Sequence, residues 1–247
     1  MARVIPPERF SAVVSAAARV FIAHGYQRAQ VQDVADTLGL GKGTLYGYAS
    51  GKAALFAAAV RYADGHESLP APAELPVPAP ARGEIAALVA SRLAGEIADL
   101  ELTRALARPL PADADREAGA AELAGIVTDL YACLARHRVA IKLVDRCAAE
   151  LPDLAEVWFG TGRRANVGAV EDYLVRRERA GTLRLPGPAA LVARTVVELC
   201  VLWAVHCRFD PGAVETPDAT RAEPIDDAKV AAMLAELIVR ATIPPSH

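Results

Sequence analysis

The stretch that decides the fold is LGLGKGTLYGYASGKAALF, residues 38–56, which places five glycines within thirteen positions. A glycine costs a helix interior about 1 kcal/mol relative to alanine, so these glycines need a physical reason. Two phosphate-binding patterns fail here. The Walker motif needs glycine at position 36, where Asp36 stands, and a GxGxxG motif begun at Gly39 needs glycine at position 44, where Thr44 stands.

Helical spacing on both sides of this stretch predicts a helix-turn-helix. Apolar residues repeat with the i, i+3, i+4 period over residues 7–24, and Gly25 ends that helix. A short helix over 31–38 is closed by Gly39, at the position where a left-handed glycine ends a helix. A third helix over 42–49 and a fourth from Lys52, with Ser50 as its N-cap, complete the unit. Its predicted core comprises Phe10, Val14, Phe21, Val34, Leu38, Leu45, Leu55 and Phe56.

A contact surface on the third helix explains its glycines. At 100° per residue, Leu45 and Ala49 share the face that packs inward, so Gly43 and Gly47 point outward. A stripe without side chains lets the helix backbone come close to what it faces, and nearby hydroxyl and amine groups suit phosphate oxygens and base edges. The predicted flanks of this stripe are Lys42 and Tyr46 on one side and Thr44 and Tyr48 on the other, with Lys52 adding charge at the start of the fourth helix.

The composition favours an all-α fold. The 247 residues are 53% hydrophobic, 23% charged and only 5% aromatic, which excludes disorder throughout and favours helices over a sandwich or barrel. Residues 1–66 hold seven Lys and Arg against four Asp and Glu, whereas the other 181 residues hold twenty against twenty-six. The basic first quarter hints at a polyanionic partner, although a solvated surface would explain it about as well.

Prolines mark the domain boundary. Five of them alternate with small residues between Ser68 and Ala81, which prevents a helix and favours extended geometry. The sequence therefore predicts a helix-turn-helix domain over 1–66, a proline-rich linker over 67–81 and a larger helical domain over 82–247. Helical patterns in the larger domain recur at 84–107, 117–135, 138–150, 153–180, 187–208 and 226–241.

The cysteines suggest neither a disulfide framework nor a metal site. Cys133 and His137 stand four residues apart, and Cys200, His206 and Cys207 lie within two turns, yet buried apolar thiols are the better interpretation for these residues and for Cys147. No CxxC pair and no secretory signal are present, so we expect a reducing, cytoplasmic location. The apolar run 196–205 is half the roughly 20 residues that a bilayer span needs, and no membrane segment is expected.

The last long helices favour a dimer. The helix over 187–208 is apolar almost all round, so it must be buried on more than one side. We expect it to form a four-helix bundle with the preceding helix and their two symmetry mates. Glu198, Trp203 and His206 then serve the interface, an effector pocket or the core. The apolar positions of the preceding helix are Val157, Val167, Val170, Tyr173 and Leu174.

Several spaced motifs together carry a family resemblance. Gly25-Tyr26, Val31-x-Asp33-Val34-Ala35, the run from Leu38 to Tyr48 and Lys52-x-Ala54-Leu55 resemble the DNA-binding domain of the tetracycline-repressor (TetR) family, over residues 8–62. The resemblance implies an all-helical homodimer that reads a palindromic operator and leaves it when a small effector binds the larger domain. It implies groove or base contacts for Gln32, Lys42, Gly43 and Thr44, and phosphate contacts for Tyr46, Tyr48 and Lys52.

The sequence departs from the family pattern around the two short helices. Ala29 and Gln30 stand where a Ser or Thr usually precedes the second helix, and Gly41 stands where a Ser usually starts the third. Both helices lose a side-chain cap, although glycine costs only tenths of a kcal/mol there. Ala49 replaces the usual Phe and Gly51 a polar residue. These changes loosen the recognition helix.

The predicted function is a dimeric, ligand-responsive transcriptional repressor without catalysis or a cofactor. The alternative is an enzyme or small-molecule carrier built on the C-terminal domain. No paired carboxylates, nucleophile with a base, or metal cage supports catalysis. Salt-dependent binding to duplex DNA distinguishes a repressor from a carrier.

Overall fold

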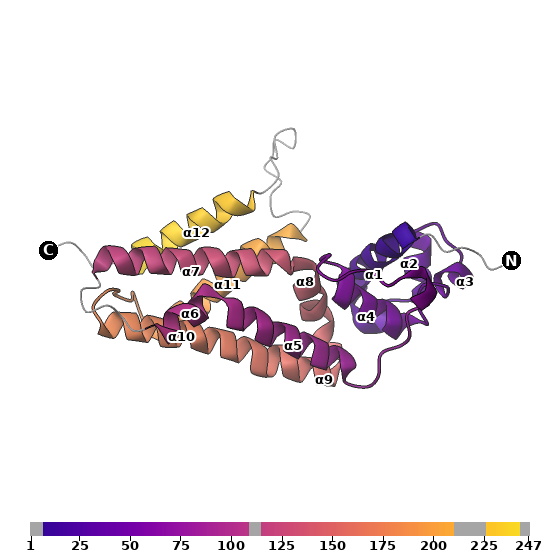
Figure 1. Cartoon of the computed structure of the whole chain (residues 1–247), viewed down its shortest axis with the longest axis horizontal. Coiled ribbons are helices and arrows are strands. Elements are labelled where there is room, and N and C mark those ends of the chain that lie inside the picture. The colour runs from indigo at the N-terminus through magenta and orange to yellow at the C-terminus, as the bar shows by residue number, and fades with distance from the viewer. Residues whose placement is uncertain (1–6, 109–114, 210–225, 243–247) are drawn as a thin grey trace. The chain divides into compact units, whose positions relative to one another are not determined.

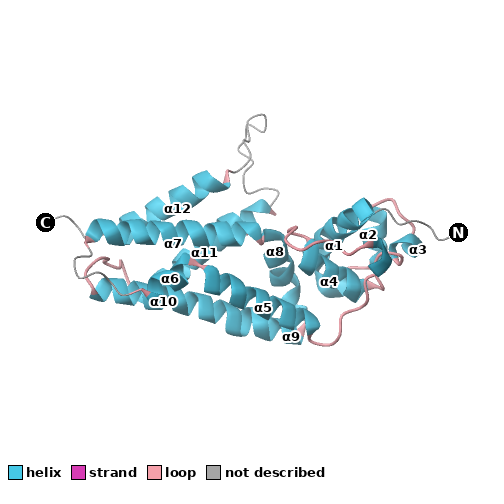
Figure 2. Ribbon diagram, viewed as in Figure 1, coloured by secondary structure: helices cyan, strands magenta, loops and turns pink. Residues whose placement is uncertain are grey.

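The computed structural model describes residues 7–108, 115–209 and 226–242, and the regular elements in these ranges are helices, as the cyan ribbons of Figure 2 show. This confirms the predicted all-α class. The helices are α1 Pro7–Arg28, α2 Val31–Thr37, α3 Lys42–Leu45, α4 Lys52–Tyr62, α5 Glu84–Asp99, α6 Glu101–Ala107, α7 Arg116–Arg136, α8 Arg138–Cys147, α9 Pro152–Ala155, α10 Arg163–Arg179, α11 Ala189–Ala204 and α12 Asp227–Thr242 (Figure 1). Short 3-10 helices cover Pro72–Glu74, Ala148–Glu150 and His206–Arg208, and a π-helix covers Glu156–Gly162.

The chain packs into two compact units. The first unit contains the described residues up to Ser91 together with His137–Gly160, and the second contains Arg92–Arg136 and the described residues from position 161 onward. Packing therefore adds residues 82–91 and 137–160 to the N-terminal unit. The predicted domain limits at positions 66 and 81 stay a prediction.

The core of the first unit forms where α1 packs against α4 and α8. An aromatic cluster lies at its centre: the ring of Phe56 meets the rings of Phe21 and Tyr26 edge-on, with centroids 5.2 and 5.1 Å away. Each fully buried ring or leucine contributes about 1.5–3 kcal/mol. The predicted core positions are buried except Leu38, which is half-buried because it is the C-cap residue of α2.

The proline-rich segment folds back onto the residues that follow α3. The Val77 N–H donates to the carbonyl oxygen of Tyr48 at 2.9 Å, and the Ser50 N–H donates to the carbonyl oxygen of Val77 at 3.0 Å. The Ser50 hydroxyl donates to the same oxygen at 2.9 Å. The predicted N-cap role of Ser50 is therefore wrong: Gly51, with φ 131°, is the N-cap residue of α4.

The second unit is built around α7, which contacts α6, α11 and α12, while α10 packs against α11. Gly119 of α7 allows a close approach to the chain after α10, because a Cβ atom at this position would lie 2.9 Å from the Cβ atom of Thr182. By length and mean hydropathy alone, α7 and the stretch Ala189–Arg208 could span a membrane. A core helix of a soluble protein passes the same test, and both stretches contact other helices of this unit.

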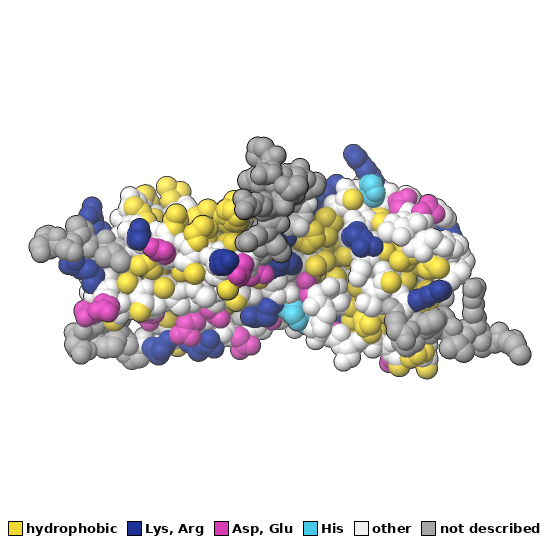
Figure 3. Space-filling view, turned by 90° about the horizontal axis from the view of Figure 1, so that it is seen from above, with side chains coloured by type: hydrophobic (Ala, Val, Ile, Leu, Met, Phe, Trp, Pro, Cys, Tyr) yellow, Lys and Arg dark blue, Asp and Glu magenta, His cyan; other side chains and the backbone are white. Residues whose placement is uncertain are grey.

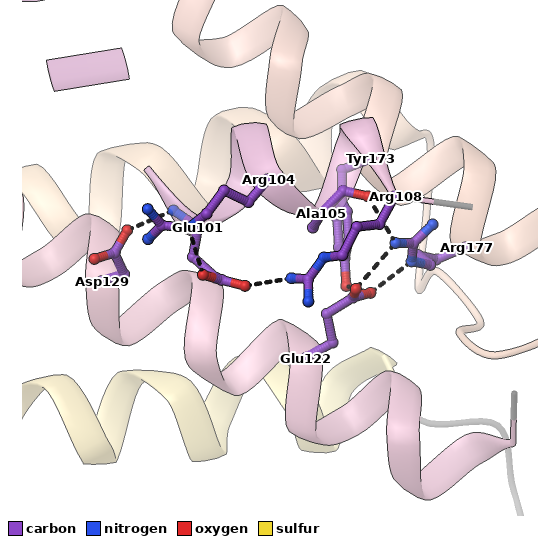
Figure 4. Close-up of polar contacts among 8 residues, drawn as sticks. All are labelled: Glu101, Arg104, Ala105, Arg108, Glu122, Asp129, Tyr173 and Arg177. Carbon is purple, nitrogen blue, oxygen red and sulfur yellow. Dashed lines mark hydrogen bonds and ion pairs between the residues drawn. The ribbon is translucent and has the colours of Figure 1, made fainter. Parts of the chain in front are cut away.

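A buried ion pair joins α6, α7 and α10 (Figure 4). The guanidinium group of Arg177, only 3% exposed, donates to both carboxylate oxygens of Glu122 at 2.6 and 3.0 Å, and to the carbonyl oxygen of Ala105 at 3.2 Å. The Tyr173 hydroxyl donates to the same carboxylate at 3.1 Å. Hydrogen bonds to Glu122 raise the pKa of Arg177, so its guanidinium group stays charged.

Three of the four thiols are buried, as the sequence predicts, whereas Cys207 is only half-buried, so the prediction is wrong for this residue. Cys133, Cys147 and Cys200 are buried, and burial raises the pKa of each thiol to about 12. Only a thiolate is a good metal ligand or nucleophile, so these side chains act as small apolar groups. Within the described ranges, the acidic, histidine and cysteine side chains form no cluster that could hold a metal ion.

Candidate DNA-binding surface

The turn between α2 and α3 has the geometry that its glycine predicts. Gly39 adopts φ 62°, in the left-handed region. Its N–H donates to the carbonyl oxygen of Asp36 at 3.1 Å, and the Leu40 N–H donates to that of Ala35 at 2.9 Å. This is the double hydrogen bond of a Schellman motif, which satisfies carbonyl groups at the end of a helix. The two short helices are thus connected by a defined turn.

The recognition helix is shorter than predicted. Regular α3 covers only Lys42–Leu45, although hydrogen-bonded turns continue to Ala49, whose N–H donates to the carbonyl oxygen of Leu45 at 3.2 Å. The glycines at 43 and 47 each weaken a helix. The carbonyl of Tyr48 accepts the Val77 N–H instead of continuing a helical ladder.

The outer side of this segment is open, as the helical spacing predicts. Lys42 and Gly43 are exposed and the Tyr46 side chain is 44% exposed, whereas Leu45 and Ala49 are buried. A Cβ atom on Gly43 would meet no other atom within 4 Å. Thr44 is half-exposed beside it. The surface around Gly43 therefore has free space, an amine and two hydroxyl groups.

The predicted exposure of Tyr48 is wrong. This residue is only 2% exposed, so its ring belongs to the core of the unit and not to the flank of the glycine stripe. Tyr48 follows buried Leu45 by three residues, and residues three apart lie on the same side of helical turns. Because such turns continue past Leu45, Tyr48 is buried with it. A buried ring is unsuited to the phosphate contact that the family resemblance implies for it.

Two further predicted residues make contacts within the protein. The exposed side chain of Gln32 donates from Nε2 to Oδ1 of Asp36 at 2.7 Å. The Nζ atom of Lys52 donates to the carbonyl oxygen of Gln27 at 2.9 Å and lies 4.9 Å from the centroid of the Tyr26 ring, a cation–π distance. Lys52 thus holds the chain that leads into α2.

The sequence does not predict the contact between Glu150 and the backbone N–H of Gln27. The backbone N–H of Gln27 donates to Oε2 of Glu150, 123 residues away in the sequence. Nothing in the local sequence pattern points to this contact, because it joins a backbone amide to a side chain of a distant segment. Only α8, which carries Glu150 on the 3-10 turn after it and packs on α1 and α4, brings the two together.

The helix-turn-helix segment is similar to a known protein family. Residues 13–59, which include α2, the glycine turn and α3, match the family of bacterial regulatory proteins, tetR family. The chain carries a tetR-family regulatory domain. A helix-turn-helix of this family belongs to DNA-binding transcriptional regulators, and α3 is the second helix of this motif in the tetR domain.

Solved structures extend the likeness from the tetR domain to the whole fold. The ketosteroid transcriptional regulator KstR2 of Mycobacterium tuberculosis has a TM-score of 0.55 at 14% identity, with 99% of this chain and 100% of that chain covered. A tetR-family regulatory protein from Rhodococcus RHA1 has a TM-score of 0.50 at 16% identity, with 96% and 98% covered. No curated protein matches the sequence. At these identities the likeness shows the fold alone.

Proposed function

We propose that this protein is a cytoplasmic, ligand-responsive transcriptional repressor that binds a palindromic operator as a homodimer and leaves the DNA when a small molecule binds its helical domain. The observation that carries the proposal is the open surface of α3. Gly43 has free space above it and is bordered by exposed Lys42, half-exposed Thr44 and Tyr46. Lysine and hydroxyl groups are the usual partners of phosphate oxygens, and a bare backbone allows close contact with base edges.

The proposed contacts follow the exposure of each side chain. Gly43 and Thr44 face the major groove, and Lys42 reaches both the groove and a phosphate at its edge. Tyr46 donates to a phosphate, and exposed Gln32 reaches the groove from α2. Lys52 holds Gln27, and its two remaining N–H donors leave it able to bind a phosphate as well. Tyr48 is left out because its ring is buried.

Replacing Lys42 by Ala is expected to weaken DNA binding about tenfold at low salt, since each subunit loses a phosphate contact worth roughly 0.5–1 kcal/mol. The slope of log affinity against log salt falls by about 0.9 for each lost contact, thus by about 1.8 in a dimer. The measurement is a salt titration by fluorescence anisotropy, on a duplex that the wild-type protein enriches from a randomised 30-base-pair library.

The matched control is Lys229→Ala, which removes the same charge from an exposed position of α12. It should leave both affinity and salt slope unchanged. An equal loss in the two variants would mean that net charge alone attracts the DNA. If the wild-type protein enriches no duplex at all, the proposal as a whole fails.

An exposed face of α11 supports the dimer. Leu191, Thr195, Glu198 and Leu202 recur along one side of this helix, and the two leucines are 65% and 43% exposed. The carboxylate of Glu198 forms ion pairs with the guanidinium groups of Arg163 in α10, at 2.5 Å, and Arg194 in α11, at 2.6 Å. A carboxylate with its charge paired therefore lies between the two leucines. By contrast, Val170, Tyr173 and Leu174 of the predicted interface are buried within the chain itself.

The dimer proposal predicts that Leu202→Glu raises the dissociation constant of the dimer at least tenfold, because it places a carboxylate in an apolar contact on both subunits. Sedimentation at micromolar concentration measures the result. Met233→Glu is the matched control, because Met233 is an apolar residue of α12 that is 45% exposed. Figure 3 shows that hydrophobic side chains gather on this face, left of the grey segment. A monomer produced by Met233→Glu and not by Leu202→Glu would assign the interface to α12 instead.

Release of the DNA requires two dimer forms with different spacing of their recognition helices. A dimer binds well when these helices are one duplex turn, about 34–36 Å, apart. An effector that prefers the other form by a few kcal/mol shifts the equilibrium and releases the operator. This scheme makes the effector's preference between the two forms the quantity to measure.

A further inference from the structure

Two charged side chains hold the backbone of Gln27 from opposite sides. Its carbonyl oxygen accepts Nζ of Lys52, which comes from the first turn of α4. Its N–H donates to the carboxylate of Glu150, which ends the 3-10 turn after α8. We call Gln27, Lys52 and Glu150 the Gln27 clamp. Hydrogen bonds to charged groups are about twice as strong as neutral ones.

The clamp acts where α1 changes direction into α2. Gly25 interrupts α1 with φ 77°, and a Cβ atom there would lie 2.5 Å from Oε1 of Glu150. After this kink α1 continues to Arg28, and only Ala29 and Gln30 separate it from α2, which begins at Val31. Whatever fixes Gln27 therefore fixes the start of the helix-turn-helix.

Helix α8 carries Glu150 and is itself fastened to the tetR domain at both ends. At its start, the carboxylate of Asp64, which follows α4, accepts the N–H groups of Val139 and Ala140 at 2.9 Å each. At its end, the Cys147 thiol lies 3.7 Å from the carbonyl oxygen of Phe21 in α1. Arg146 pairs with Glu150 at 3.6 Å and orients that carboxylate. The segment 138–150 thus braces α4 and α1 together.

We propose that Glu150 is a positioning residue for DNA recognition: through the backbone of Gln27 it sets the orientation in which α2 and α3 meet the duplex. The inference rests on the proposed function and goes beyond it, because it makes a segment that begins 79 residues after the matched region 13–59 part of the DNA-reading unit. The tetR domain alone then lacks the carboxylate that positions its recognition helices on DNA.

The sign of the effect provides the test. Removing a carboxylate from a DNA-binding unit normally strengthens binding, since it removes repulsion from the phosphates. The clamp predicts the opposite for Glu150→Ala: affinity for the duplex selected by the wild-type protein falls about fivefold. Glu150→Gln keeps an oxygen acceptor and stays within about twofold of wild type. Glu156→Ala, which removes an exposed carboxylate of the same unit, does not weaken binding.

Amide hydrogen exchange of the full chain provides a second readout that needs no DNA. In Glu150→Ala, exchange over residues 25–30 should become at least tenfold faster, with the C-terminal helices unaffected. Unchanged exchange there, or equal or tighter DNA binding by Glu150→Ala, overturns the inference and leaves the proposed function standing. A wild-type protein that binds no duplex overturns the proposed function, while faster exchange in Glu150→Ala still establishes the clamp.

Discussion

Replacing Gly43 by Leu should weaken DNA binding about 100-fold while leaving the protein at least as stable as the wild type. The stability follows from the free space above Gly43 and from its helical backbone, which a leucine adopts without strain. Leucine also gains up to about 0.5–1 kcal/mol of helix stability relative to glycine. The loss of binding follows from a side chain inserted into a close contact, at about 1–3 kcal/mol per site and two sites per dimer.

Gly125→Leu is the matched control. Gly125 is an exposed glycine of α7, and a Cβ atom placed on it would likewise meet no other atom within 4 Å, so the same substitution there should affect DNA binding little. Anisotropy titration and thermal unfolding of the two variants give the comparison. If Gly43→Leu binds the duplex as tightly as wild type, the glycine stripe does not lie against DNA.

Replacing Glu122 by Ala should cost the helical unit about 3–5 kcal/mol, because it leaves a buried guanidinium without its counter-charge. Arg177 is 3% exposed and would keep the carbonyl of Ala105 and the face of the Tyr173 ring but no counter-charge from Glu122, and the Tyr173 hydroxyl would lose its acceptor. The measurement is urea unfolding followed by tryptophan fluorescence. The chain has two tryptophans, so a Trp158→Phe background makes Trp203 the reporter for the second unit.

Glu101→Ala controls for the loss of a carboxylate that is not buried. Glu101 pairs with Arg104 and Arg108, which are 55% and 61% exposed in the same region (Figure 4). Exposed ion pairs contribute little to stability, so this variant should unfold close to wild type. Glu122→Gln, which keeps an oxygen acceptor, should fall between the two. A Glu122→Ala protein as stable as wild type would show that Arg177 finds water or another acceptor.

Helix positions could be predicted because burial imposes a period on the sequence. The patterns at 117–135 and 226–241 correspond closely to α7 and α12. The predicted helix over 84–107 is interrupted at Leu100, between α5 and α6, where neither glycine nor proline is present to indicate a break. This break depends on Asp129 of α7, whose carboxylate accepts the Glu101 N–H at 2.8 Å. A contact between residues 28 positions apart leaves no trace in local spacing.

The same reasoning explains what could be predicted of the DNA-binding surface. The exposure of Gly43 and Tyr46 and the burial of Leu45 follow from one turn of helical spacing. The burial of Tyr48 agrees with the same spacing, because Tyr48 follows Leu45 by three residues, so its predicted exposure contradicts the spacing itself. No sequence pattern predicts the hydrogen bond between Glu150 and Gln27, because the N–H that donates belongs to the backbone and every residue except proline has one.

The attachment of Val77 beside Tyr48 and Ser50 changes what the proline-rich segment can transmit. A proline-rich stretch without such contacts behaves as a semi-rigid spacer of about 3.1 Å per residue. Pulling on one end of it would first straighten the stretch itself. Because Val77 is hydrogen-bonded to residues 48 and 50, only residues 78–83 separate this attachment from the start of α5 at Glu84. A displacement of the first turn of α5 would therefore pull on residues 48–50, which follow α3, through this short segment.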